Sequence, residues 1–357
     1  MDKNKEIETY TGYLETDVKH MKKVVTIGGG TGSFTLLSGL KKYPIELSAV
    51  VSMADDGGST GILRDELGVL PPGDVRQCLV ALSDTPDMLR ELMNYRFAEG
   101  SLEGHSFGNI FLSALEKITG DFGEGVKEAA KILNVHGQVI PVTLSDTRLY
   151  MELKNGDVLV GEHEINVSKK FEKVGVKKVF LRPRPKANLL AVKKILEADL
   201  IVIGPGNHYC AIIPNLLVPG IAEALRQTRA KIVYNCNLIS KRGQTDLFSL
   251  EDYVREVNGY IGKERIDFVT YNIKQPSSQL LKKYEADGLL VPFLNTSERK
   301  YRVIRADILS RAKISRGQED KIAHTRAFIR HDPEKLAKVL VMLLELEGYE
   351  SILKDIV

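Results

Sequence analysis

The chain has 357 residues, of which 43% are hydrophobic and 27% are charged, and its formal net charge is +3. These values are ordinary for a soluble globular protein with a substantial core, built as one large domain or two smaller ones. The mild charge does not indicate nucleic acid, and it suits a protein that binds anionic small molecules. The three cysteines are widely spaced and form no CxxC pair, so they are typical of reduced cytosolic thiols and exclude a disulfide framework or a zinc site.

Residues 1–20 are polar and charged, and they lack the apolar segment of a signal peptide. No apolar run is long enough to span a bilayer. We therefore expect a cytoplasmic protein with no membrane partner. The expected organisation is a polar N-terminal extension at residues 1–20, a single nucleotide-binding domain at 21–347 and a C-terminal tail at 348–357.

Apolar runs that are typical of strands alternate with helical patterns along most of the chain. This alternation predicts an α/β fold that is Rossmann-like, with a mainly parallel sheet and helices on both faces. Strands are expected at 24–27, 47–53, 179–181, 200–203, 231–235 and 266–272. Helices are expected from about Phe34 to 40, from an Asp74 N-cap to 82, at 88–97, 106–115, 187–196, 213–226 and 250–257, and from Pro333 onward. Asn155-Gly156 predicts a small antiparallel hairpin excursion.

Two glycine-rich loops each follow one of the first two expected strands. The first is Gly28-Gly29-Gly30-Thr31-Gly32, and the second contains Gly57-Gly58-Ser59. Glycine lets the backbone approach a ligand closely, and a helix N-terminus presents N–H groups to phosphate. The two loops therefore predict one pocket for a diphosphate or nucleotide, with a packing turn as the alternative. The third glycine of an NAD fingerprint would fall at Ser33, so a dehydrogenase is not favoured.

Adjacent carboxylates, Asp55 and Asp56, open the second glycine loop. Carboxyl ends of strands are where open α/β sheets bind ligands. These side chains can hold Mg²⁺ against a diphosphate, or accept hydrogen bonds from a sugar hydroxyl. The alternative is that they only shape the turn.

Other polar residues stand at expected strand ends or helix starts and are candidate contacts for the nucleotide or its phosphates. Arg76 can bind phosphate or pair with Asp74. The remaining candidates are Asn109, Gly204, Pro205, Gly206, Asn207, Asn215, Asn235 and Thr245. Aromatic residues are not interleaved with the basic ones and tryptophan is absent, so nucleic acid is not an expected partner.

These motifs, together with Pro71-Pro72-Gly73-Asp74 and His331-Asp332-Pro333, occur in an order that resembles one family over residues 22–347. The chain resembles the bacterial gluconeogenesis factors of the YvcK type, relatives of 2-phospho-L-lactate transferase (CofD). The resemblance implies a Rossmann-like fold, binding of UDP-sugars such as UDP-N-acetylglucosamine, and a role in gluconeogenic growth and cell shape. The chain departs from the usual pattern at 207–211 and at 241–245, where nucleotide contacts are expected.

Two hypotheses follow. In the first, the protein is a non-catalytic, regulatory nucleotide-sugar binder that links carbon metabolism to cell-wall and cell-shape control. The diphosphate then lies on the amides of 28–32 and 204–206, and Asn109, Asn215 and Asn235 orient the ligand. In the second, it is a Mg²⁺-dependent phospholactate-type transferase that cleaves a nucleoside diphosphate conjugate. A homodimer is the expected oligomeric state.

Overall fold

The computed structural model describes residues 21–168, 174–284, 288–294, 299–311 and 329–345. In this part of the chain, a seven-stranded sheet has the order β10-β9-β8-β7-β1-β2-β3, and every neighbouring pair is parallel. Its strands are β1 (Lys23–Gly28), β2 (Glu46–Val51), β3 (Gln138–Pro141), β7 (Leu200–Ile203), β8 (Lys231–Asn235), β9 (Phe268–Asn272) and β10 (Arg302–Ala306). The order reverses between β1 and β7, which is where doubly wound sheets open a crevice at their carboxyl ends.

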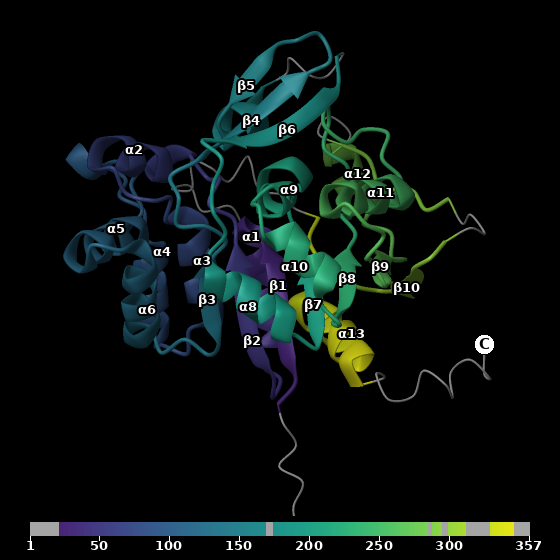
Figure 1. The fold of residues 1–357 in the computed structure, drawn as a ribbon, viewed down its shortest axis with the longest axis horizontal. Coiled ribbons are helices and arrows are strands. Elements are labelled where there is room, and N and C mark those ends of the chain that lie inside the picture. Colours follow the sequence, from purple (N-terminus) through teal and green to yellow (C-terminus); the bar gives the residue numbers. More distant parts are fainter. Residues whose placement is uncertain (1–20, 169–173, 285–287, 295–298, 312–328, 346–357) are drawn as a thin grey trace, which may run out of the picture.

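Helices flank the sheet (Figure 1). One group contains α1, α3 and α13, and α1 packs against both of the others, while α10 packs against α8 and α11. This confirms the predicted Rossmann-like architecture. The α-helices are α1 (Gly30–Leu40), α2 (Gly58–Leu67), α3 (Gly73–Leu82), α4 (Asp87–Asn94), α5 (Phe107–Thr119), α6 (Phe122–Ile132), α7 (Glu162–Val167), α8 (Leu189–Glu197), α9 (Ile213–Leu216), α10 (Ile221–Gln227), α11 (Leu250–Ile261), α12 (Ser278–Tyr284) and α13 (Pro333–Glu345), with a π-helix at His208–Ile212 and a 3₁₀ turn at Gly100–Leu102.

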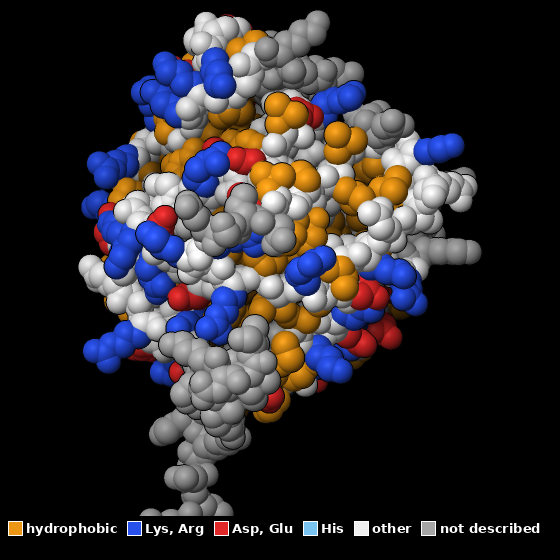
Figure 2. All heavy atoms as spheres, turned by 90° about the vertical axis from the view of Figure 1, so that its right-hand side faces the viewer, with side chains coloured by type: hydrophobic (Ala, Val, Ile, Leu, Met, Phe, Trp, Pro, Cys, Tyr) orange, Lys and Arg blue, Asp and Glu red, His pale blue; other side chains and the backbone are white. Residues whose placement is uncertain are grey.

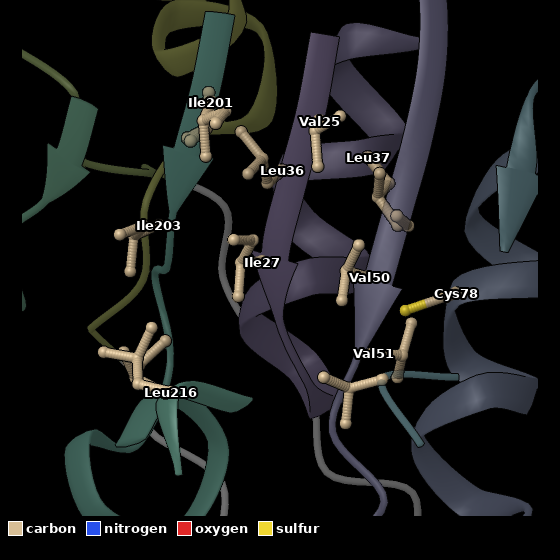
Figure 3. Packing of buried hydrophobic residues seen from close by; sticks show 14 of the residues in the cluster. Val25, Ile27, Leu36, Leu37, Val50, Val51, Cys78, Ile201, Ile203 and Leu216 are labelled. Atoms are coloured by element: carbon tan, nitrogen blue, oxygen red, sulfur yellow. The ribbon is translucent and has the colours of Figure 1, made fainter. Parts of the chain in front are cut away.

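The core lies where α1 crosses the middle strands. Leu36 and Leu37 of α1 lie beside Val25 and Ile27 of β1 and Val50 of β2 (Figure 3), and all five side chains are buried. The central strands consist mostly of consecutive apolar residues, because helices cover both faces of the sheet. This packing fixes the carboxyl ends of β1, β2 and β7 relative to one another.

A second, antiparallel sheet has the order β5-β4-β6, with strands β4 (Arg148–Leu153), β5 (Val158–Val160) and β6 (Val176–Arg182). The Asn155-Gly156 turn joins β4 to β5, so the predicted hairpin is confirmed. The predicted strand at 179–181 belongs to this sheet, because β6 pairs with β4. We call residues 148–182 the insert. The parallel strand β1 begins at the bottom of the central sheet in Figure 1 and ends at its top. The insert lies above the top of the sheet, over the carboxyl ends of the parallel strands.

The helix ends expected at 97, 115 and 257 lie instead at Asn94, Thr119 and Ile261. Three further predictions are wrong at a helix start or within a helix. Helix α1 begins at Gly30 and not near Phe34, so the end of the first glycine motif forms the first helical turn. Asp74 is the second residue of α3, and Pro72 occupies the N-cap position. The expected helix at 213–226 is interrupted after α9, because Pro219 and Gly220 break it and Gly220 has a φ of 98°. Both outer segments, 1–20 and 348–357, lie outside the described residues.

The face that looks right in Figure 1 gathers hydrophobic side chains in its middle, with lysine and arginine side chains around them (Figure 2). Exposed apolar residues in the stretch from β9 to the region after α12 are Ile273, Leu289 and Leu294. Among the described residues, no single helix combines the length and apolar composition needed to cross a membrane. One pair of helical segments with a bend between them, His208–Leu216 and Ile221–Gln227, meets both criteria only when the two are taken together, by length and composition alone.

Candidate functional site

The loops that follow β1 and β7 meet at the point where the strand order reverses. Gly32, in the first turn of α1, lies so close to the second loop that a Cβ atom on it would come within 2.0 Å of the carbonyl oxygen of Pro205. The predicted phosphate loops at 28–32 and 204–206 therefore form one continuous surface. Any side chain at Gly32 would force them apart.

Three asparagines tie these loops to the sheet. The side-chain amide of Asn215 donates to the carbonyl oxygen of Gly28 at 3.3 Å, and that of Asn235 donates to Gly204 at 3.3 Å. Asn237 donates likewise to the carbonyl oxygen of Gly206 at 2.9 Å. Asn215 and Asn235 are fully buried. The structure thus places these two predicted ligand contacts behind the loops, where they hold the loop backbone in position.

The N-termini of α1 and α2 lie in this region with glycine at both N-cap positions, so neither N-cap residue supplies a capping side chain. The Asp74 carboxyl accepts a hydrogen bond from the Gly30 amide at the start of α1. The N-cap residues are Gly29 for α1 and Gly57 for α2, and neither first turn contains an acidic residue. The first N–H groups of a helix have no partner within the helix, and the helix dipole makes this end attractive to anions. The two glycine motifs therefore bring suitable anion-binding backbone to the carboxyl ends of β1 and β2, as the sequence predicts.

Two carboxyl groups lie beside these N-termini. Asp55 accepts hydrogen bonds from the Gly57 amide at 3.0 Å and from the Thr60 hydroxyl at 2.8 Å. Asp74 lies against the first glycine motif, where a Cβ on Gly29 would come within 2.2 Å of its Oδ2. Burial raises the pKa of both groups, and the charge of Asp55 raises that of Asp74 further. A cation that bound between them would relieve this cost.

Asp56 turns toward the insert, although it is the direct neighbour of Asp55. It accepts a hydrogen bond from the backbone amide of His163 at 2.7 Å. Asp56 is thus hydrogen-bonded to the insert, whereas Asp55 and Asp74 lie near enough to each other for the charge of Asp55 to raise the pKa of Asp74. Among the described residues, no group of three or more His, Cys, Asp or Glu side chains is arranged to hold a metal. Two carboxylates fit Mg²⁺ if phosphate oxygens and water complete its shell.

Arg76 and Asn109 support the second loop from below. The Arg76 Nε donates to Asn109 Oδ1 at 2.9 Å, and Nη1 donates to the Met93 carbonyl at 3.1 Å. Asn109 in turn donates to the hydroxyls of Ser59 and Thr60, each at 3.3 Å. Arg76, Asn109 and Ser59 are buried. Their contacts fix the first turn of α2, and the Arg76 charge lowers the pKa of Asp55 and Asp74 in part.

The insert supplies residues that the sequence did not single out. Glu162, at the start of α7, has a pKa of about 8, because burial and then the charge of Asp55 disfavour its ionised form. It forms a hydrogen bond with the Cys210 thiol. Asn166, one turn further along α7, accepts hydrogen bonds from Asn207 at 3.3 Å and from the Lys241 ammonium. No motif marks Glu162 or Asn166, because only the hairpin carries α7 back to the strand ends.

Thr245 lies behind the site. Its hydroxyl accepts hydrogen bonds from the Lys241 amide and from the Tyr253 hydroxyl, each at 2.8 Å, and it is buried. Gln244 donates to the Ile165 carbonyl at 3.0 Å, which joins the turn at 241–245 to α7. Thr245 therefore positions the Lys241 turn.

Comparison with known proteins agrees with this architecture. The family model for 2-phospho-L-lactate transferase CofD matches residues 24–309. The gluconeogenesis factor of Bacillus subtilis is 39% identical over 330 residues, which cover 90% of this chain and 98% of that protein. The gluconeogenesis factor of Halalkalibacterium halodurans is 42% identical over 265 residues, which cover 74% of this chain and 81% of the relative.

A solved structure shows the same fold. The crystal structure of a Bacillus halodurans protein of the UPF0052 family superposes with a TM-score of 0.80 at 35% identity, covering 90% of this chain and 99% of the other. The family model spans most of the chain. The chain is therefore a member of the CofD family, and it is similar to the gluconeogenesis factors.

Proposed function

We propose that this protein is a regulatory binder of nucleotide sugars, which senses a UDP-sugar and links carbon metabolism to cell-wall and cell-shape control. The relatives named gluconeogenesis factor support the metabolic part of this proposal. The ligand is a nucleoside diphosphate conjugate that lies across the crevice between β1 and β7. It acts by occupying the site and is not consumed.

One observation carries the proposal. Two helix N-termini with glycine N-caps, those of α1 and α2, lie at the carboxyl ends of the neighbouring strands β1 and β2, beside the switch point of the sheet. Backbone N–H groups at such ends suit phosphate, and two of them suit a diphosphate. Asp55 and Asp74 lie beside these ends and fit either a Mg²⁺ ion that bridges the phosphates or the hydroxyls of a sugar.

A binder without turnover is consistent with the side chains present. In the described part of the crevice, the hydroxyls and the histidine near the second loop are engaged with one another. Ser59 lies 3.3 Å from His105 Nδ1, and both are buried beside Asn109. Neither group is placed to activate a nucleophile, which needs a base within hydrogen-bond reach of a reactive, accessible group.

The family model favours a second function, because it describes a transferase. Phosphoryl-type transfer needs mainly positioning and charge neutralisation, so it does not require a base of the classical kind. In this alternative, Asp55 and Asp74 would hold Mg²⁺ beside the diphosphate, and an acceptor hydroxyl would attack the distal phosphorus. The P–O bond to the proximal phosphate would break, a nucleoside monophosphate would leave, and the hydroxyl proton would pass to solvent. When bound, the ion would spread the negative charge that develops on the phosphate oxygens.

The two functions differ in what happens to the ligand. We expect that purified protein incubated with UDP-N-acetylglucosamine and Mg²⁺ binds the nucleotide sugar and returns it intact, as followed by ³¹P NMR. Release of UMP or UDP at a rate that Asp55→Asn abolishes would replace the regulatory function with the transferase. If the purified protein does not bind the nucleotide sugar at all, both proposed functions are contradicted.

A further inference from the structure

Lys241 is a cation that the fold holds between the insert and the segment after β7. It begins the turn that follows β8, where its own amide donates to the Thr245 hydroxyl at 2.8 Å. The Tyr253 hydroxyl donates to the same oxygen at 2.8 Å, and Gln244 is bound to the backbone of α7. These contacts fix the backbone of Lys241 and leave its side chain as the part that can move.

The ammonium of Lys241 lies among groups of the insert and of the segment after β7. It donates to Asn166 Oδ1, which also accepts a hydrogen bond from Asn207, the residue after Gly206. Its charge lowers the pKa of Glu162 and of Cys210 in part, so it lies within electrostatic reach of both. A Cβ on Gly57, the N-cap of α2, would be 3.9 Å from Glu162 Oε2. Lys241 is therefore linked through Asn166 and Asn207 to the loop at 204–206, and through Glu162 to the Gly57 loop.

The charge around the crevice is one-sided. The charges of Asp55 and Glu162 raise the pKa of Asp74, and those of Asp55 and Asp56 raise the pKa of Glu162. Arg76 is hydrogen-bonded to Asn109 and Met93 beneath them. A diphosphate brings further negative charge into this region. Its binding requires a cation on the ligand's side of the crevice, and a lysine ammonium is a compact point charge that serves phosphate well.

We propose that Lys241 is the cation that recognises the diphosphate, and that its ammonium leaves Asn166 for the phosphate oxygens when the ligand binds. This inference rests on the proposed function, because it names the residue that contacts the charged phosphates of the same ligand. The hydrogen bond to Asn166 holds the ammonium near the loop after β7. Lys241 is a binding residue in this account and takes no part in a reaction.

The test compares UDP with UMP on three variants by calorimetric titration. Lys241→Met removes the charge and keeps the length of the side chain, and we expect it to weaken UDP binding at least tenfold. Lys241→Arg keeps the charge, and we expect a loss of about threefold or less. Lys177→Met is the matched control, because Lys177 is an exposed lysine of the insert that pairs with Glu152.

If Lys241 recognises the charge of the diphosphate, Lys241→Met reduces the salt dependence of UDP binding and lowers the preference for UDP over UMP. If Lys241 has only a structural role, the substitution distorts the site, lowers the affinities for UDP and UMP equally and leaves the salt dependence unchanged. If wild-type protein does not bind UDP, the proposed function fails. If wild-type protein binds UDP and Lys241→Met binds it equally well, this inference alone is overturned.

Discussion

Gly32 lies against the carbonyl oxygen of Pro205, and a Cβ atom in its place would be only 2.0 Å from that oxygen. The contact joins the first turn of α1 to the loop after β7. Both loops are in turn held from behind by Asn215 and Asn235. The candidate diphosphate surface is therefore a single rigid unit at the switch point of the sheet, although its halves are far apart in the sequence.

We expect Gly32→Ala to lower the free energy of unfolding by about 1–3 kcal/mol, because a backbone oxygen cannot rotate away from the added methyl group. Nucleotide binding should weaken as the two loops separate. Gly259→Ala is the control, since Gly259 also lies in a helix and has nothing within 4 Å of a Cβ position. That change should be neutral or stabilise by up to about 1 kcal/mol. Urea unfolding of both variants checks the pair, and equal effects would contradict the contact.

We expect Asn215→Ala to lower the free energy of unfolding by about 1–3 kcal/mol, since it removes a donor to the buried carbonyls of Gly28 and Ala211. Nucleotide affinity should fall with it, because Gly28 loses its support. Gln227→Ala, which also removes an amide side chain but at an exposed position at the end of α10, should change stability by about 0.5 kcal/mol or less. Chemical denaturation and nucleotide titration measure the two effects. A variant of unchanged stability that fails to bind nucleotide would instead make Asn215 a direct ligand contact.

Glu162 gives the protein a defined pH dependence. Its pKa rises from the ordinary value of 4.5 to about 8 in the folded protein, so it stabilises the fold most while protonated. That stabilisation is lost as the pH rises from about 4.5 to 8. Glu162→Gln cannot ionise, and we expect its unfolding midpoint to exceed that of the wild type by about 2–4 °C at high pH and to match it below pH 5.

The matched control for this prediction is Glu152→Gln in the same insert. Lys177 and Lys178 lower the pKa of Glu152 to about 2, so its contribution to stability is present above the ordinary carboxyl pKa and is lost toward acid. Glu152→Gln should therefore lower the midpoint equally at neutral and high pH. Calorimetric scans at several pH values distinguish a midpoint that is raised only at high pH from one that is lowered at neutral and high pH. A Glu162→Gln midpoint equal to that of the wild type at every pH would contradict the burial of Glu162.

The sequence predicted the parallel sheet well, because strands covered on both faces are almost entirely apolar, as in β7. It also located both glycine loops, since glycine-rich turns after apolar strands are a local signal. It could not show that Asn215 and Asn235 hold the backbone of the loops, because an asparagine that holds a loop and one that binds a ligand look the same in sequence. Glu162 and Lys241 were not singled out, because their proximity depends on how the insert folds back over the sheet.

The start of α1 shows the same limit. Glycine disfavours a helix interior, so the sequence placed the helix start near Phe34. In the structure the helix begins at Gly30, and close packing of Gly32 against Pro205 requires glycine there. Local propensity was overridden by a contact between residues more than a hundred and seventy positions apart.

The most direct test is calorimetric titration of the purified protein with UDP-N-acetylglucosamine, UDP-glucose, GDP and NAD, with and without Mg²⁺. We predict micromolar binding of the UDP-sugars, weakened strongly by Gly30→Val or Asp55→Ala in the crevice and unchanged by Lys177→Met on the insert surface. Binding of GDP alone, and only with Mg²⁺, would favour the transferase. Failure of every nucleotide to bind, or UDP-sugar binding that Gly30→Val and Asp55→Ala leave intact, would contradict the assignment of this crevice as the nucleotide-sugar site.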